Sequence, residues 1–302
     1  MNDFPWKGTR LRIHPLFWLV IAFSVWTGRF VEVLTWFVLV VIHELGHVTA
    51  AVSFGWRIGE VTLLPFGGVA NTEEWGTVPS REELAVALAG PFHHVIMVAV
   101  SWIFYSGGLW SREWTEYFIQ CNLWLAGFNL LPVWPLDGGR ILLAILGWGM
   151  PYRLAISVVY GTGFLLSAVL LLIALLSGES VHLSLAVIAL FLLGSNIGGY
   201  RKRSIQFMRF LLHRHAFGVP GSARPHELFL CGTDSLKKVV HAFYKERYHM
   251  IRVKDRSGKE IGLIPEEKVL DAYFLGGRPG DFHGRIPNGK KRTGTDGTNR
   301  RS

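Results

Sequence analysis

Long blocks of apolar residues without any charged side chain dominate the first two hundred positions of the chain. Residues 154–176 and residues 181–199 contain no Asp, Glu, Lys or Arg, and each is close to the length of about 20 residues that a helix needs to cross a bilayer. Because a soluble helix shows apolar stripes instead of such blocks, the pattern predicts an α-helical polytopic membrane protein. We expect about six spans, at residues 13–28, 31–54, 84–106, 117–133, 154–176 and 181–199.

The distribution of basic residues between the predicted spans indicates the orientation of the chain. An even number of spans places both termini on the same side of the membrane. Most basic residues lie on that side, and only Arg29 and Arg112 lie on the other. Since short cytoplasmic loops carry the excess of Lys and Arg, we expect both termini to be cytoplasmic. The basic residues on this side are Lys7, Arg10, Arg12, Arg57, Arg81, Arg140, Arg153, Arg201, Lys202 and Arg203.

The connection between the second and third predicted spans is too apolar for an ordinary loop. Its segment VTLLPFGGVA, residues 61–70, is too short and too often interrupted by Gly and Pro to span a bilayer. We expect a hairpin or re-entrant segment with Gly67 and Gly68 at the bend. Non-helical backbone at membrane depth is tolerated only against protein or a water-filled cavity, so we also expect a cavity nearby.

A change in composition after Tyr200 marks the end of the predicted membrane domain, residues 1–200. We expect a linker at residues 201–224, followed by a small cytosolic α/β domain at residues 225–276. The remaining residues 277–302 are rich in Gly, Pro and basic side chains without periodicity, which is typical of a disordered tail.

The predicted α/β domain contains two helical segments around a pair of strands. The first helix should cover residues 234–243, with Asp234 as its N-cap. The segments HMIRVKD and EIGLI should form two strands joined by the turn RSGK. The second helix should begin with Pro265 in its first turn.

The net charge of +9 comes from the C-terminal part of the chain. Residues 201–302 hold 22 Lys or Arg against 10 Asp or Glu. A basic segment beside a membrane can bind anionic lipid head groups, and no reader motif for nucleic acid occurs, so no nucleic acid is expected as a direct partner. Cys121 and Cys231 lie far apart in segments of different character, which indicates neither a disulfide framework nor a CxxC metal site.

The stretch VIHELGHVTA, residues 41–50, places two histidines and a glutamate in an apolar segment. On a helix His43 and His47 share one face and can coordinate one Zn²⁺. Glu44 is then close enough to take a proton from an attacking water. Ionisable groups near the bilayer centre cost about 2.5–3.5 kcal/mol each, which a bound metal offsets. The alternative is a cluster of buried polar residues that satisfy one another.

A catalytic zinc site usually has three protein ligands and one open position. The candidate for the third ligand is Asp137, in NLLPVWPLDGGR at residues 129–140, where Pro and Gly interrupt the helix and place a carboxylate back toward the membrane. An alternative role for Asp137 is the N-cap of the next helix. Asn129 in the same segment can donate a hydrogen bond to an oxyanion or to the substrate backbone.

These motifs resemble those of the site-2 protease family of intramembrane zinc metalloproteases. The resemblance rests on HELGH in a membrane helix, LLPFGGV in a hairpin, and a later N-x-x-P followed by LDG. It implies that His43, His47 and Asp137 hold zinc. It also implies that Glu44 is the catalytic glutamate and that Asn129 is the motif asparagine.

The sequence departs from the family pattern at two places. Trp134 stands where many members have proline. In AGPFHH, residues 89–94, His94 stands where many members have Asn, which raises the question whether His93 or His94 touches the metal site. For both histidines we favour a packing or hydrogen-bonding role over a role as ligand.

Along most of residues 10–275 the chain resembles one branch of this family, which acts in bacterial sporulation. The resemblance implies a substrate, the membrane-associated precursor of sporulation sigma factor K, and a location in the outer forespore membrane facing the mother cell. It also implies regulatory membrane protein partners and a C-terminal CBS-like domain that binds ATP. The unit has the length of a single CBS repeat, which needs a partner copy to bury its face and so predicts a homo-oligomer.

The reaction implied by the resemblance is hydrolysis of a peptide bond within or beside the membrane. We expect a substrate segment to add as a strand to the hairpin, at Pro65, Phe66, Gly67 and Gly68. One alternative is a metal-dependent membrane transporter or receptor with a cytosolic sensor domain, which does not need Glu44 beside the ligands. Another is a membrane-embedded peptidase of prenylated proteins, which acts on soluble lipidated tails.

Overall fold

The chain folds into two compact units in the computed structural model. Within the described residues, the helical unit runs from residue 10 to residue 224 and includes residues 242–247, and the smaller unit comprises residues 225–241 and 248–276. The predicted disordered tail, residues 277–302, lies outside the described residues. The structure describes residues 10–13, 15–64, 67–72, 74–176, 182–219, 224–231, 234–254 and 259–276.

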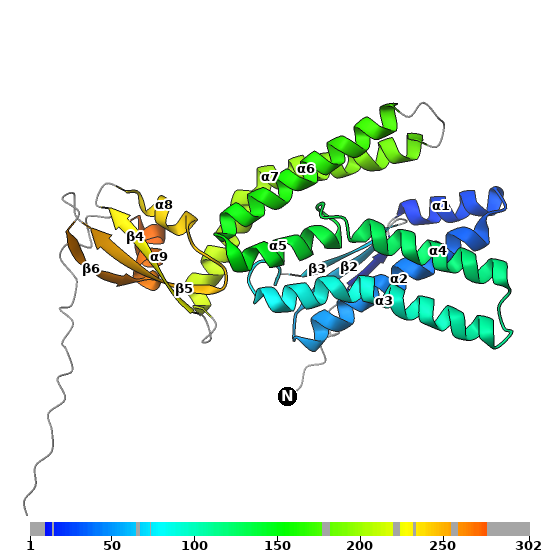
Figure 1. The fold of residues 1–302 in the computed structure, drawn as a ribbon, viewed down its shortest axis with the longest axis horizontal. Coiled ribbons are helices and arrows are strands. Elements are labelled where there is room, and N and C mark those ends of the chain that lie inside the picture. Colours follow the sequence, from blue (N-terminus) through cyan, green and yellow to red (C-terminus); the bar gives the residue numbers. More distant parts are fainter. Residues whose placement is uncertain are drawn as a thin grey trace, which may run out of the picture. The chain divides into compact units, whose positions relative to one another are not determined.

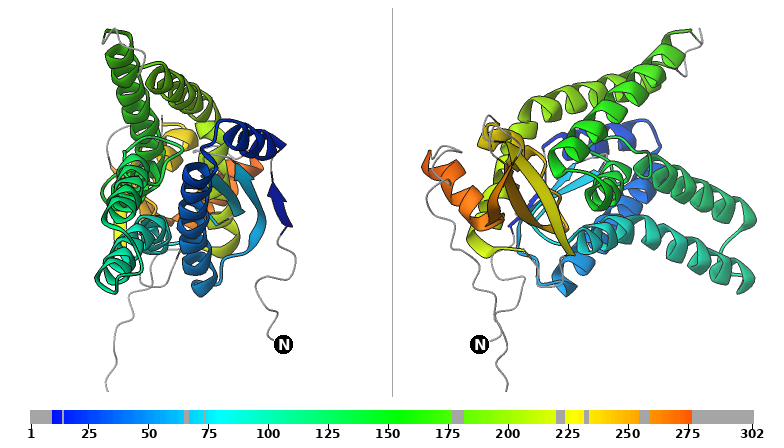
Figure 2. Two further views of the ribbon diagram at one scale, coloured as in Figure 1. Left: turned by 90° about the vertical axis from the view of Figure 1, so that its right-hand side faces the viewer. Right: turned by 60° about the vertical axis from the view of Figure 1, so that its left-hand side comes forward.

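Helices make up most of the described part of the helical unit (Figure 1). They are α1 (Pro15–Trp26), α2 (Phe30–Ser53), α3 (Ser80–Ser106), α4 (Arg112–Asn129), α5 (Asp137–Gly149), α6 (Tyr152–Leu176) and α7 (His182–Phe217). Helix α3 is central, because it packs against α2, α4 and α5. Helices α6 and α7 run side by side, as the further views in Figure 2 also show.

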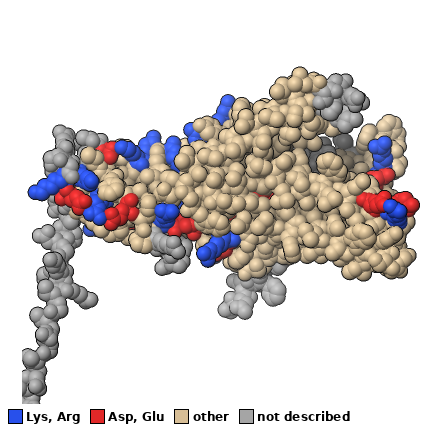
Figure 3. Space-filling model, viewed as in Figure 1, with Lys and Arg blue, Asp and Glu red and all other residues tan. Residues whose placement is uncertain are grey.

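Four of the described helices, α2, α3, α6 and α7, are long and apolar enough to cross a membrane. Helix α1 has only 12 residues, and α4 has 18 residues with Arg112 and Glu116 near its start. On the face of the helical unit seen in Figure 3, charged side chains are sparse, and large apolar side chains such as Trp124 and Phe164 are exposed, as expected of a lipid-facing surface. The helices therefore support an integral membrane protein, and the number of about six spans stays a prediction.

Helix α7 continues well beyond the apolar block that predicts it. The segment expected to be a linker, residues 201–224, begins inside this helix, which ends at Phe217. The physical reason is that charged residues end the lipid-facing block without breaking the helix, and Phe207 and Leu211 still bury one face. The helix stops where Gly218 adopts a φ of 72°, a conformation that suits glycine at a helix end.

A three-stranded sheet lies beside α2 in the helical unit. Its strands are β1 (Arg10–Ile13), β2 (Ile58–Leu64) and β3 (Gly67–Thr72), in the order β1-β2-β3. Strand β2 pairs antiparallel with β3 and parallel with β1. The predicted bend at Gly67 and Gly68 is wrong, because both are paired residues of β3. With Leu64 opposite Gly67, only Pro65 and Phe66 remain between the strands, and both lie outside the described residues.

A buried ion pair anchors the N-terminal end of α3 within the helical unit. Glu83 lies 2.5 Å from Lys245 Nζ, and the two side chains are 3% and 4% exposed. The other carboxylate oxygen of Glu83 accepts a hydrogen bond from the backbone N–H of Gly76. Because a buried charge without a partner is costly, these contacts hold residues 242–247 against the N-terminal end of α3.

The smaller unit contains a second three-stranded sheet and two helices. The strands are β4 (Arg224–Cys231), β5 (Arg247–Lys254) and β6 (Glu260–Pro265), in the order β4-β5-β6, and the helices are α8 (Leu236–His241) and α9 (Glu266–Leu275). The predicted strand pair is confirmed as the antiparallel pair β5–β6, with Ile251 opposite Ile264. The N-cap of α9 is Pro265, so the proline precedes the first turn in which it was expected.

Helix α8 is shorter than predicted for residues 234–243. Its N-cap is Ser235, whose hydroxyl accepts a hydrogen bond from the backbone N–H of Lys238. Asp234, the predicted N-cap, accepts a hydrogen bond from the backbone N–H of Cys231 and pairs with the Lys238 ammonium at 2.7 Å. The CBS type of this unit and ATP as its ligand stay predictions.

Candidate metal centre

The two histidines of HELGH lie on one face of α2, as their spacing predicts. His43 and His47 are 4% and 5% exposed. Their ring centroids are 4.7 Å apart, and the rings are nearly perpendicular at 86°. The two Nε2 atoms lie 3.1 Å apart, so both imidazoles present one ring nitrogen to the same point.

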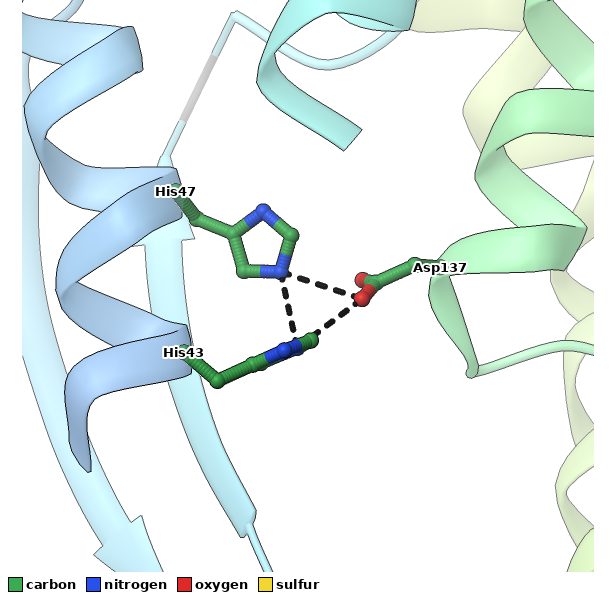
Figure 4. A group of neighbouring side chains, drawn as sticks. All are labelled: His43, His47 and Asp137. Atoms are coloured by element: carbon green, nitrogen blue, oxygen red, sulfur yellow. Dashed lines mark hydrogen bonds and ion pairs between the residues drawn. The ribbon is translucent and has the colours of Figure 1, made fainter. Parts of the chain in front are cut away.

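Asp137 brings a third ligand atom to this point from another helix (Figure 4). Its Oδ2 lies 3.0 Å from His43 Nε2 and 3.1 Å from His47 Nε2. Asp137 is the first residue of α5, and the N-cap is Leu136. The alternative role of Asp137 as the N-cap is therefore wrong by one position, and its buried carboxylate faces the two histidines instead.

Two glycines allow the first turn of α5 to lie against the loop that precedes it. A Cβ at Gly138 would overlap backbone carbonyl oxygens of this loop, and a Cβ at Gly139 would lie 2.9 Å from the backbone nitrogen of Trp134. The loop is also held from α7, because Asn196 Nδ2 donates a hydrogen bond to the carbonyl of Trp134 at 2.7 Å. The sequence LDGG thus fixes the place from which Asp137 reaches α2.

The three ligand atoms have the spacing and chemistry of a zinc site. Two imidazole nitrogens and a carboxylate oxygen are lone-pair donors, and at 3.0–3.1 Å they repel one another unless a cation or proton lies between them. Tetrahedral ligands at about 2.0–2.1 Å from zinc lie about 3.3 Å from one another. Within the described residues these three side chains form the group that could hold a metal ion, and a donor set of two His and one Asp fits Zn²⁺.

A backbone carbonyl of α3 fixes the orientation of His47. The Nδ1 of this imidazole lies 2.7 Å from the carbonyl oxygen of Val86. Because a carbonyl oxygen only accepts, Nδ1 carries a proton and donates it to this bond. The lone pair of His47 is then on Nε2, the atom that faces Asp137.

The other predicted site residues lie on the elements around this group. Glu44 follows His43 on α2 and is half-buried. Asn129 is the last residue of α4 and is also half-buried. Gly67 and Gly68 belong to β3, which contacts α2. The catalytic and binding roles of these residues stay predictions.

The two histidines of AGPFHH take different positions on α3. His94 is 2% exposed, and its Nε2 lies 3.1 Å from Nδ1 of His43. His93 is half-buried, and its Nδ1 donates a hydrogen bond to the backbone carbonyl of Ala89 at 2.7 Å. Neither belongs to the metal-ligating group found among the described residues, and both make hydrogen bonds, as the sequence interpretation favours.

Sequence reasoning missed two residues of α3 that shape the site, Val86 and Gly90. A Cβ at Gly90 would overlap the imidazole of His47 and lie 2.7 Å from Cε1 of His43. The imidazoles of His43 and His47 therefore pack directly against the backbone of Gly90. A signal for it exists in the sequence, because small residues inside an apolar helix, as in ALAGP, permit close helix packing in membranes.

Substitution of Gly90 by Ala should strongly reduce the zinc content of the purified chain. The added methyl group occupies the space of the His47 ring, so the ligand atoms can no longer meet at one point. Zinc per chain after purification in detergent measures the effect. The matched control is Gly161→Ala on α6, where a Cβ meets no atom within 4 Å, and full zinc occupancy in Gly90→Ala would contradict the prediction.

The chain matches a known family over the region that contains this site. Residues 31–112 and 107–173 match the model of peptidase family M50. The stage IV sporulation protein FB of Bacillus subtilis is 35% identical over 269 residues, which cover 88% of this chain and 91% of that protein. A zinc metalloprotease of Methanocaldococcus jannaschii is 37% identical over 158 residues, which cover 51% of this chain and 45% of that protein.

A solved structure resembles about two thirds of the chain. The site-2 protease from Methanocaldococcus jannaschii has a TM-score of 0.51 and 31% sequence identity, and the match covers 66% of this chain and 94% of that chain.

Proposed function

Because this chain belongs to peptidase family M50, the family of the site-2 proteases, and is a zinc metalloprotease on that ground, we propose that it hydrolyses a peptide bond of a membrane-associated substrate at the site between α2 and α5. The observation that carries the proposal is the convergence of His43, His47 and Asp137 at 3.0–3.1 Å. Glu44 follows the first ligand directly. A transporter or receptor would need the ligands but not this carboxylate, so the alternative is not favoured.

In the proposed reaction His43, His47 and Asp137 hold zinc. When bound, zinc supplies a Lewis acid that polarises a peptide carbonyl and makes water acidic enough to react near neutral pH. The carboxylate of Glu44 accepts the proton of the attacking water and delivers it to the nitrogen of the leaving amine. Asn129, at the end of α4, donates a hydrogen bond to the oxyanion that develops.

Strand β3 is the proposed docking edge for the substrate. In the described sheet β2 has partners on both sides, whereas β3 is an edge strand and contacts α2. An added strand would hold the substrate backbone extended, with its carbonyl groups open to attack. Gly67 and Gly68 of the predicted hairpin belong to this edge, and glycine in a strand permits close approach of another backbone.

The proposed substrate follows from the similarity to the sporulation protein, which extends over 91% of that protein. On this basis we propose the membrane-associated precursor of sporulation sigma factor K as the substrate. The proposed location is the outer forespore membrane, with both termini cytoplasmic and facing the mother cell. Regulatory membrane proteins and a second copy of this chain are the proposed partners.

Cleavage of the sigma-factor precursor by the purified chain in liposomes tests this assignment. We expect one shortened product that disappears when zinc is chelated and returns when zinc is added. The mature sigma factor without its pro-segment is the matched control and should stay intact. An intact precursor, in a preparation that binds zinc and cleaves another membrane-inserted peptide, would overturn the substrate assignment and leave the protease assignment in place.

A further inference from the structure

A buried chain of hydrogen bonds connects the proposed ligand His43 to helices α3 and α4. Nδ1 of His43 lies 3.1 Å from Nε2 of His94 on α3. Nδ1 of His94 lies 2.8 Å from Oδ1 of Asn122 on α4. His94 and Asn122 are 2% and 0% exposed, so bulk water does not compete for these contacts.

Asn122, the last residue in this series of contacts, determines which atom donates in each hydrogen bond. Asn122 Nδ2 donates to the backbone carbonyl of Phe118 at 2.8 Å, which turns Oδ1 toward His94. A carboxamide oxygen only accepts, so Nδ1 of His94 carries the proton. Nε2 of the neutral imidazole then has the lone pair, and it accepts a hydrogen bond from Nδ1–H of His43.

The consequence at the metal site is that His43 has its lone pair on Nε2. This is the atom that lies 3.0 Å from Asp137 Oδ2 and 3.1 Å from His47 Nε2. The hydrogen bond from His47 Nδ1–H to the carbonyl of Val86 likewise leaves the lone pair of His47 on Nε2. Helix α3 therefore supplies the partner of both histidine ligands, once from its backbone and once from the side chain of His94.

We propose that His94 and Asn122 are positioning residues that fix the tautomer and the ring orientation of the zinc ligand His43. Neither residue contacts the reacting atoms. Partners of this kind around a metal ligand typically change metal affinity or activity about 10–100-fold when they are removed. The inference rests on the metal site proposed above.

A purely space-filling role for His94 makes a different prediction, which variants can separate. Phe in place of His94 keeps a ring of similar size but removes both hydrogen bonds. Gln in its place has a side-chain oxygen that can accept a hydrogen bond from His43 Nδ1–H. If only volume matters, Phe is the better substitute, whereas if the hydrogen bond matters, Gln is.

The experiment measures the zinc dissociation constant of the purified full-length chain by competition with a chelator. We expect His94→Phe to weaken zinc binding about 10–100-fold, and His94→Gln to bind zinc more tightly than His94→Phe does. His93→Gln is the matched control on the neighbouring residue, whose imidazole bonds to the backbone of its own helix, and it should bind zinc as the wild type does. Monodisperse elution in detergent shows that each variant is folded.

Asn122→Leu tests the second step without a change at His94. It removes the acceptor for His94 Nδ1–H, so it should also weaken zinc binding. Because both residues act through the same hydrogen bonds, the double variant Asn122→Leu with His94→Phe should be little worse than His94→Phe alone. If His94→Phe does not fold, the Asn122→Leu result decides.

Wild-type affinity in His94→Phe or Asn122→Leu would overturn the inference, as would a full sum of the two single effects in the double variant. These outcomes differ from a failure of the proposed function, in which the wild-type chain itself would bind no zinc. The cobalt-loaded chain gives a second readout, because a displaced His43 ring alters the absorption bands that report tetrahedral coordination.

Discussion

Substitution of Glu44 by Gln should abolish peptide hydrolysis while the purified chain keeps its zinc. The two side chains have nearly the same shape, but a carboxamide cannot accept a proton and return it at neutral pH. Loss of a general base typically costs about 10²–10⁴ in rate, and Glu44 is proposed to move the proton in both halves of the reaction. The measurement is the rate of precursor cleavage together with the zinc content of the same preparation.

The matched control is Glu116→Gln on α4. This glutamate is exposed and pairs with Arg112 one helical turn earlier, so its substitution should change neither cleavage nor zinc. Cleavage at the wild-type rate by Glu44→Gln would remove Glu44 from the mechanism. A loss of zinc in Glu44→Gln would assign this residue to the metal site instead of to proton transfer.

The pair of histidine ligands could be predicted because its geometry is local. A spacing of four residues places His43 and His47 on one helix face whatever surrounds the helix. Asp137 lies 90 residues from His47 in the sequence, so spacing alone could not place it. The prolines before it and the glycine pair after it made it a candidate, and the resemblance to the site-2 proteases implied its role as a ligand. The structure brings these three side chains together at 3.0–3.1 Å.

The surroundings of the ligands could not be predicted in the same way, because they depend on contacts between helices. His94 is 51 residues away from His43 and 28 residues away from Asn122 in the sequence. Val86 acts through its backbone carbonyl, so its side chain carries no signal. Gly90 has a local signal, but only the packing of α3 against α2 shows which side chains it accommodates.

Two of the differences between the predicted and the observed fold have a common physical cause, because local composition alone does not decide secondary structure. Charged residues after position 200 end the apolar block, yet helix α7 continues because Phe207 and Leu211 bury one face. Gly67 and Gly68 are typical of a turn, yet they are paired in β3. In both segments tertiary contacts decide between structures that the local sequence permits.

The largest effect on metal binding is expected for Asp137→Asn. The substitution preserves shape but removes the negative charge that offsets a divalent cation in a buried site, and it replaces a carboxylate oxygen by a weak neutral ligand. Removal of a hydrogen-bonding partner outside the ligand group typically weakens metal binding about 10–100-fold. We expect the loss of zinc affinity in Asp137→Asn to be larger. Competition with a chelator measures this loss directly, and peptide hydrolysis should be lost with it.

Thermal unfolding gives an independent test of the same substitution. A ligand that binds only the folded chain stabilises it by about 2.7 kcal/mol at a free concentration of 100 times its dissociation constant. Zinc should therefore raise the unfolding temperature of the wild type and of the control Asp271→Asn, an exposed position on α9. It should leave Asp137→Asn nearly unchanged, because His43 and His47 alone cannot hold the ion. A zinc-dependent rise of wild-type size in Asp137→Asn would mean that the third ligand is another residue.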